Sequence, residues 1–190
     1  SWKAKADELA QGIKNCFWID GKNYFGAYYI GLPVSSLYEG YETLGESLSV
    51  LTGIAPAGTE TDVLSAVKPG RWGMSVVAPQ LSGIKSYHND AVWPFVQGYR
   101  CLALKKAGDF DSCEKEFASM VYTSSLFRTF RENFRASDCD MDGTELSSDR
   151  QLWSVGSWLS LMYKIVCGID FTSEGLSVKP LVFDSLKNGV

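Results

Sequence analysis

The segment "YHNDAVWPFVQGY", residues 87–99, determines where a long apolar helix of the chain begins. Pro94 lacks a backbone N–H, and inside a helix its ring clashes with the carbonyl four residues earlier. The helix is therefore predicted to begin within the two residues before Pro94, with Asn89 or Asp90 at its entrance. Short polar side chains at this position can cap the free backbone N–H groups of the first turn.

Two interpretations of the loop before this helix are open. A loop at a helix N-terminus can present Tyr87, His88, Asn89 and Trp93 to a ligand. Alternatively, His88 and Asn89 only hold the loop in place. For Trp93 alone we favour packing in the core, because tryptophan side chains are usually highly buried.

Apolar residues at spacings of three and four predict helices through most of the chain. The predicted helices cover residues 1–16, 39–55, 59–66, 92–107, 111–133 and 149–167. The last one is apolar nearly all round, which indicates burial on most sides. Glu174-Gly175 reads as a turn followed by a strand at 176–183. We predict a single mainly α domain over 1–190, with helices in hairpins and long loops at one end.

Composition excludes several classes of protein. The 190 residues are 45% hydrophobic with a net charge of -4, so a packed core is expected and no basic stripe for nucleic acid is visible. No apolar run approaches the roughly 20 residues that cross a bilayer. Five cysteines without a CxxC pair and one histidine predict no metal site. Cys101 and Cys167 lie in apolar helical segments and are predicted to be buried thiols.

Aromatic residues make up 13% of the chain, including six tryptophans. They indicate either a large core or a cleft in which rings lie against the flat C–H faces of sugars. Composition alone does not separate these two interpretations.

Three segments together resemble a known family. "YHNDAVWPFVQGY" is similar to the helix-entry motif of the six-hairpin, or (α/α)6-barrel, glycoside hydrolases, especially those related to the glucosidase domain of glycogen-debranching enzymes and to cellobiose-phosphorylase-like proteins. "RENF", "DGTELSSDRQLWSVGSWLSLMYKIVCGI" and the tail "GIDFTSEGLSVKP" resemble later segments of the same family, in the same order. The resemblance covers most of the chain.

The resemblance implies an (α/α)6 toroid, of which this chain holds only part. A full barrel has twelve helices, whereas 190 residues accommodate about six. The chain is therefore expected to be the C-terminal half of a catalytic barrel, with a short β segment at its C-terminus. The implied partners are an oligosaccharide or glycan and the N-terminal remainder of the barrel. The implied chemistry needs no cofactor, and a periplasmic or secreted location is slightly favoured over a cytoplasmic one.

The resemblance also points to a general base. Glycoside hydrolysis uses two carboxyl groups, and in an inverting enzyme one protonates the leaving oxygen while the other activates water. Family members of this type are mostly inverting, and Glu132 matches the position of their late glutamate. The alternative is a solvated helix residue that pairs with Arg128 or Arg135. Glu145 is the second candidate, and its alternative is an ion pair with Arg150 that anchors the loop.

The general acid is harder to place. Asp90 is the only carboxylate inside the helix-entry motif, and helix capping is its favoured role. Glu39 and Glu42 are weaker candidates that are expected to be solvated or capping groups. The family acid is expected to lie before Ser1.

Further aromatic and polar residues are candidates for a sugar subsite. Trp72 lies in a Gly-rich segment and could stack on a sugar, while Tyr87, His88, Gln151 and Trp153 match positions of the family motifs. The alternative for Gln151 is a capping contact at the start of the last helix. Core packing is slightly favoured for Trp153.

Three hypotheses for function follow. The first is an inverting glycoside hydrolase, with a phosphorylase as a variant whose phosphate pocket the scattered Arg71, Arg150 and His88 do not form. The second is a non-catalytic carbohydrate-binding or scaffold lobe of a larger enzyme. The third, a plain helical protein with its aromatics in the core, is disfavoured by the joint presence of the three motifs.

Overall fold

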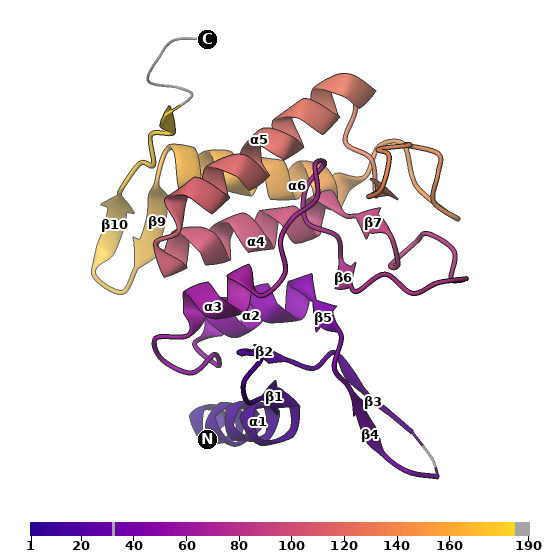
Figure 1. Ribbon diagram of the computed structural model, residues 1–190. Coiled ribbons are helices and arrows are strands. Elements are labelled where there is room, and N and C mark those ends of the chain that lie inside the picture. The colour runs from indigo at the N-terminus through magenta and orange to yellow at the C-terminus, as the bar shows by residue number, and fades with distance from the viewer. Residues whose placement is uncertain (32, 185–190) are drawn as a thin grey trace.

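The computed structural model describes residues 1–31 and 33–184. This part of the chain is helical with small antiparallel sheets, which is compatible with the predicted mainly α class (Figure 1). Its helices are α1 (Trp2–Phe17), α2 (Thr43–Thr52), α3 (Glu60–Ser65), α4 (Pro94–Ala107), α5 (Phe110–Phe127) and α6 (Leu152–Leu161), followed by a π-helical segment η1 (Met162–Val166).

The strands are short and pair two by two in antiparallel ladders. The ladders are β1 (Trp18–Ile19) with β2 (Tyr24–Phe25), β3 (Tyr28–Ile30) with β4 (Ser36–Tyr38), β5 (Tyr41–Glu42) with β6 (Val77–Ala78), β7 (Ala91–Val92) with β8 (Phe134–Arg135), and β9 (Ile169–Thr172) with β10 (Gly175–Val178). The tail therefore forms a hairpin, as its turn signal predicts, but its second strand ends at Val178, before Pro180.

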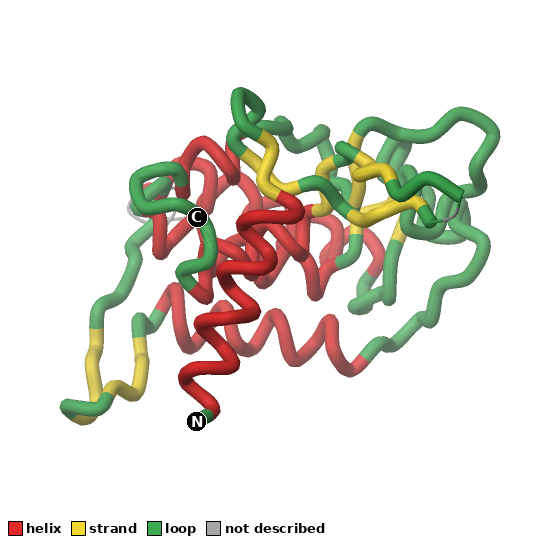
Figure 2. Tube along the Cα trace, turned by 90° about the horizontal axis from the view of Figure 1, so that it is seen from below, coloured by secondary structure: helices red, strands yellow, loops and turns green. Residues whose placement is uncertain are grey.

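Two of these ladders join the loops that precede the long helices. β5–β6 connects the loop before α2 with the loop before α4, and β7–β8 connects the loop before α4 with the loop before α6. The long loops consequently lie together at one end of the helices, as predicted, while the β9–β10 hairpin projects from the opposite end (Figures 1 and 2). This shared loop end positions the candidate site.

The helix boundaries follow from local backbone chemistry. α4 begins at Pro94, where the missing N–H costs nothing, and α2 ends at Gly53, which adopts φ 75°. The predicted helix over 111–133 is too long by six residues. Arg128 takes a left-handed φ of 57° and ends α5 after Phe127, so Glu132 lies in a loop and not on a helix.

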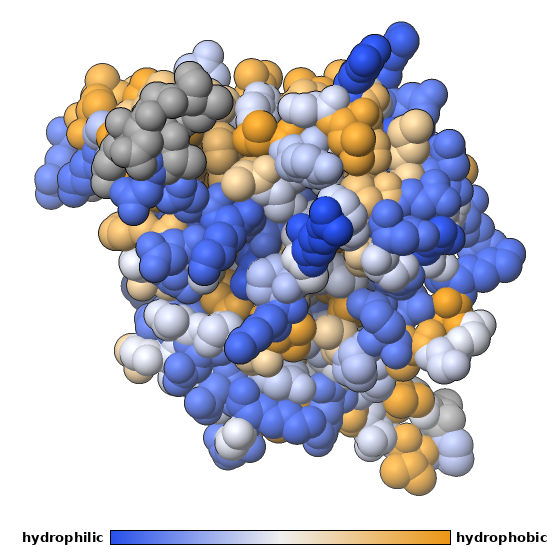
Figure 3. Space-filling view, turned by 45° about the horizontal axis from the view of Figure 1, so that its top comes forward, coloured by the Kyte–Doolittle hydropathy of each residue, from blue (hydrophilic) through white to orange (hydrophobic). Residues whose placement is uncertain are grey.

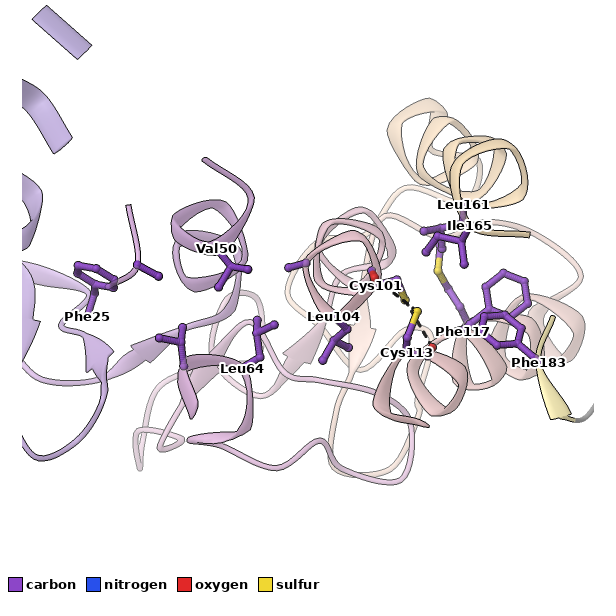
Figure 4. Packing of buried hydrophobic residues seen from close by; sticks show 14 residues of the cluster. Phe25, Val50, Leu64, Cys101, Leu104, Cys113, Phe117, Leu161, Ile165 and Phe183 are labelled. Carbon is purple, nitrogen blue, oxygen red and sulfur yellow. Dashed lines mark hydrogen bonds between the residues drawn. The ribbon is translucent and has the colours of Figure 1, made fainter. Parts of the chain in front are cut away.

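α4 lies at the centre of the molecule, between α2, α5 and α6. Figure 4 shows the main core as one continuous cluster that runs from Phe25 past Val50 and Leu104 to Phe183. α4 and α6 approach closely at Gly98, where an added Cβ would lie only 1.7 Å from Ser157 Oγ.

The cysteine predictions are half correct. Cys101 is fully buried between α4 and α5, where the thiol of Cys113 donates to its carbonyl oxygen at 3.4 Å (Figure 4). Cys167 is exposed, which contradicts its predicted burial. It follows η1 at the edge of the molecule, where no further helix of the described chain covers it.

The helices at the two edges of the fold are poorly covered. In α6 only Ser154 and Leu161 are buried, and Leu152 is 82% exposed. The expectation that this apolar helix is buried on most sides is therefore wrong for this chain. α1 has no buried residue, and its Trp2 and Leu9 are exposed. Hydrophobic residues also reach the surface at the β9–β10 end of the molecule, at the upper left of Figure 3.

Candidate functional site

The candidate site lies where the loops before α4 and α6 meet. The backbone N–H of Glu145 donates to Ser86 O at 2.8 Å, and Lys85 Nζ pairs with Glu145 Oε1 at 2.9 Å. These contacts hold the loop of residues 81–90 against the loop of residues 143–150. Glu145 thus has the loop-anchoring role considered as its alternative, although its partner is Lys85 and not Arg150.

Asn89 holds the helix-entry loop together. Its side chain is buried, accepts from the backbone N–H of Leu81 at 2.7 Å and donates to the carbonyls of Leu81 and Ile84. All of its amide atoms are therefore engaged by its own loop. Asn89 therefore has the role of holding the loop in place that was considered as its alternative.

Asp90 does not cap α4, contrary to the sequence-based expectation. The residue adopts a positive φ of 46°, and its carboxylate accepts from the hydroxyls of Ser137 at 2.8 Å and Ser86 at 3.5 Å. The N-cap of α4 is Trp93, which makes no side-chain capping bond. The short strand β7 lies between Asp90 and the helix, so the carboxylate is too far along the chain to reach the first turn.

A row of aromatic rings follows the entrance of α4. The imidazole of His88 stacks on Trp93, with 5.3 Å between ring centroids and an interplanar angle of 11°, and Tyr87 meets both rings edge-on. Phe95 continues the row and lies 6.0 Å from the ring of Trp153 on α6. Five of the rings in the loop and the two helices thus follow one another across the surface.

The two tryptophans of this row have different environments. Trp93 is 6% exposed, lies in a small core cluster and donates from Nε1 to Tyr87 O at 2.8 Å, as its favoured interpretation predicts. Trp153 is 50% exposed, so its predicted core packing is wrong. Trp153, on the uncovered face of α6, and His88, in the loop, are the most exposed rings of this row.

Glu132 is bonded to the loop that directly precedes α6. The residue is 6% exposed, and its backbone N–H and carboxylate Oε2 both bond to the backbone of Ser148, at 2.9 and 3.0 Å. Oε1 makes no hydrogen bond within the described part of the chain. The alternative of a solvated helix residue paired with Arg128 or Arg135 is wrong, because Arg135 pairs with Asp138 and Asp140.

Arg131 fixes the loop next to Glu132. Its guanidinium pairs with Asp149 and Asp142 and donates to Met141 O at 2.6 Å. Its carbonyl accepts from the hydroxyl of Ser154 at 2.9 Å, which ties the loop to the first turn of α6. Glu132 therefore lies on a segment that is anchored on both sides, near the helix turn that carries Trp153.

Gln151 has the capping role considered as its alternative. Its Oε1 accepts from the backbone N–H of Leu152 at 3.1 Å, and its own N–H donates to Phe130 O at 2.9 Å. Gln151 is the N-cap of α6. The side chain is therefore used by the helix that carries Trp153.

Trp72 lies apart from the aromatic row, against α5. Tyr122 stacks on its ring at a centroid distance of 5.8 Å, and the guanidinium of Arg71 lies 4.5 Å from the ring centroid. These side chains, with Lys115 and Ser119, border a separate surface pocket of about 380 Å³. The structure does not bring Trp72 together with the other predicted subsite residues.

The weaker candidates for the acid have structural partners. Glu42 accepts from the N–H groups of Leu44 and Gly45 at the start of α2, and Glu39 pairs with Lys22 at 2.7 Å. Both residues therefore serve as the capping and solvated groups that the sequence suggested.

A groove that the sequence motifs do not indicate lies between α4 and α6. The groove has a volume of about 480 Å³ and extends from Phe95 and Trp153 past Tyr99 to Lys164, over a floor of Gly156, Ser157 and Ser160. The signal was present as Phe95 and Tyr99 four residues apart on α4, and as Trp153, Gly156 and Ser160 on one face of α6.

The described residues contain no group of three or more His, Cys, Asp or Glu side chains arranged to hold a metal ion. None of the helices in the described part of the chain is long and apolar enough to cross a membrane. Comparison of the sequence with models of known protein families gives no match, and comparison with curated proteins gives none either.

Proposed function

We propose that this chain is the C-terminal half of the catalytic (α/α)6 barrel of a glycoside hydrolase that acts on an oligosaccharide or glycan. One observation carries the proposal. Glu132 is almost buried, its Oε2 is fixed by the N–H of Ser148, and Oε1 has no hydrogen-bond partner in the described chain. A buried carboxylate that is held through one oxygen suits a group that must orient a water molecule with the other.

In this proposal Glu132 is the general base of an inverting enzyme. It would take a proton from water while that water attacks the anomeric carbon. His88 and Trp153 provide exposed ring faces for the sugar, and Tyr87 supports His88. In inverting enzymes the acid lies roughly 6.5–9.5 Å from the base, and we place it on the N-terminal half of the barrel.

The uncovered edges of the fold support the barrel interpretation. α6 exposes Leu152 and Leu159, η1 exposes Tyr163, and α1 exposes Trp2 and Leu9. Exposed apolar surfaces of this kind mark sites where another part of a protein packs. The N-terminal remainder of the barrel is the proposed partner.

A carbohydrate-binding lobe without turnover is the second candidate. Asp90, Glu39, Glu42 and Glu145 all have hydrogen-bonding or ionic partners. The candidate carboxylates other than Glu132 are therefore engaged in hydrogen bonds or ion pairs. None of these four is an evident general acid. Such a lobe would bind sugars through the same aromatic row.

Hydrolysis assays on matched variants of the complete barrel, in which the N-terminal half supplies the acid, test the proposal. Glu132→Gln keeps the size of the side chain but removes the base, so the release of reducing sugar is expected to fall at least about a hundredfold. Glu145→Gln is the control, and it is expected to retain most of the activity. Saccharide binding without turnover by the complete, unmodified barrel would support the lobe. Unchanged hydrolysis by Glu132→Gln would refute the assignment of the base.

A further inference from the structure

A second cavity lies between α1 and α2, on the side of the molecule away from the α4–α6 groove. It has a volume of about 350 Å³. Most of its lining is apolar, and two carboxyl side chains, Glu42 and Glu46, complete it without any Lys, Arg or His. Its apolar walls are formed mainly by Ile13, Phe17, Phe25, Leu48 and Ile54.

Glu46 is an unusual group for the wall of an apolar cavity. Its side chain is 2% exposed, and its Oε1 accepts from the backbone N–H of Phe25 at 2.9 Å. Oε2 is buried and has no hydrogen-bond partner in the described chain. A buried polar atom without a partner destabilises the fold, so a ligand that supplies a donor there gains affinity.

Tyr41 on β5 lies close to Glu46 and its buried hydroxyl also has no hydrogen-bond partner in the described chain, so no neighbouring side chain satisfies Oε2. Glu42, at the start of the same helix, already accepts from the N–H groups of Leu44 and Gly45. The hydroxyls of Ser49 and Thr52, which also line the cavity, donate to carbonyls of their own helix. An incoming ligand would therefore find acceptor oxygens and apolar walls, with no protein cation to compete for them.

We propose that this cavity binds a small apolar primary amine, with its hydrocarbon part between α1 and α2 and its ammonium group donating to Oε2 of Glu46. The apolar walls take the hydrocarbon part, and the two carboxyl groups favour a positive charge. A neutral molecule of the same shape would fill the space between the apolar walls but would gain no charge interaction with Glu46. The proposal is independent of the proposed hydrolase, because no residue of the aromatic row lines the cavity.

Binding should depend on pH in a defined direction. Burial, with a contribution from nearby Glu42, raises the pKa of Glu46 to about 8, and the N–H of Phe25 opposes this rise. Tyr41 on β5 also lies close, and burial raises its own pKa, so it stays neutral. α1 contributes only apolar groups to the lining. An ammonium ligand pairs with ionised Glu46, so affinity should rise about tenfold per pH unit up to pH 7 and level off above 8.

Calorimetric titration with benzylamine and with benzyl alcohol, its neutral counterpart, tests the proposal. We expect benzylamine to bind at least about tenfold more tightly at pH 8, to weaken at pH 6, and to lose this advantage in Glu46→Gln. Glu8→Gln, on the exposed surface of α1, is the matched control and should bind as the unmodified chain does. Thermal melting of Glu46→Gln, followed by circular dichroism, checks that the variant is folded.

Three results would overturn the proposal. They are equal affinity for the amine and the alcohol, full benzylamine affinity in a folded Glu46→Gln variant, and no saturable binding up to about 10 mM benzylamine. None of these results bears on sugar hydrolysis, so failure here leaves the proposed function untouched.

Discussion

α4 and α6 lie side by side, yet they differ sharply in how they are covered. α4 carries several polar residues, yet Gln97 and Arg100 are buried on it, as is the apolar Leu104. α6 is the more apolar helix, yet it buries only Ser154 and Leu161. α4 has α2, α5 and α6 around it, whereas α6 packs mainly on α4. Burial of a helix is therefore set by its neighbours as well as by its own sequence.

The difference also fits the proposed half-barrel. A helix in the middle of a row of helices that forms part of a ring has neighbours on both sides. The last helix of an incomplete ring has one side open. The buried polar residues of α4 meet Glu116 of α5, whose carboxylate accepts from Gln97 Nε2 at 2.9 Å and lies 3.7 Å from Arg100. This difference in burial between α4 and α6 should appear as a difference in how mutations on the two helices change stability.

The largest effect is expected at the buried ion pair of α4. Glu116→Gln leaves the guanidinium of Arg100 uncompensated in the interior, so the free energy of unfolding should fall by about 3–5 kcal/mol, as measured by urea denaturation. The exposed pair of Lys164 and Asp170 beyond α6 is the control, and Asp170→Asn should change stability little. Equal losses of unfolding free energy in Glu116→Gln and Asp170→Asn would contradict the expected difference between the buried and the exposed ion pair.

Leucine truncation compares the two helices directly. Leu104→Ala on α4 should lower the free energy of unfolding by about 2–5 kcal/mol, because the side chain is 1% exposed and leaves a cavity. Leu159→Ala on α6 removes a half-exposed side chain and should cost less than about 1 kcal/mol. Similar values for the two variants would mean that α6 is covered in solution, for example by another copy of the chain.

The pH dependence of stability tests whether Glu46, on α2 beside α4, is buried as the structure shows. The pKa of Glu46 is raised from its ordinary value of 4.5 to about 8 in the folded protein. Its contribution to stability is therefore fully present below about pH 4.5 and is lost as pH rises through 8. Between pH 5 and 8 the unmodified chain should lose roughly 3–4 kcal/mol relative to Glu46→Gln, which mimics the protonated carboxyl group. Parallel stability curves for the two proteins would show that Glu46 is not perturbed.

The smallest effect is expected on the open face of α6. Leu152→Gln should change the free energy of unfolding by less than about 0.5 kcal/mol, because the side chain already lies in water. The variant should also be more soluble, as judged by light scattering over a concentration series. A loss of 2 kcal/mol or more would show that this face is not open.

Much of the fold follows from local signals. Pro94 and Gly53 set the ends of α4 and α2, and the apolar periodicity gives the existence of each long helix. The end of α5 was missed because Arg128 takes a left-handed conformation that no residue-type preference indicates. The open face of α6 was missed because periodicity reports apolar residues and not the presence of a neighbour.

The candidate site was only partly predictable. The motif placed Tyr87, His88 and Trp93 together, and their mutual stacking follows from their positions around one helix entrance. The role of Asn89 depends on contacts within its own loop, with Leu81 and Ile84, whereas the role of Glu145 depends on contacts with Lys85 and Ser86 of a separate loop. The contacts of Glu145 follow from how loops far apart in sequence meet, which spacing along one loop does not specify.

Saccharide binding to the aromatic row is the most direct test of the central claim, since both proposed functions require it. Calorimetric titration of the chain with a series of oligosaccharides should give saturable binding to at least one of them. Binding should persist in Glu132→Gln, weaken at least about tenfold in Trp153→Ala, and remain unchanged in Trp2→Ala on exposed α1. Absence of binding to every saccharide, or binding that is indifferent to both Trp153→Ala and His88→Ala, would contradict the account.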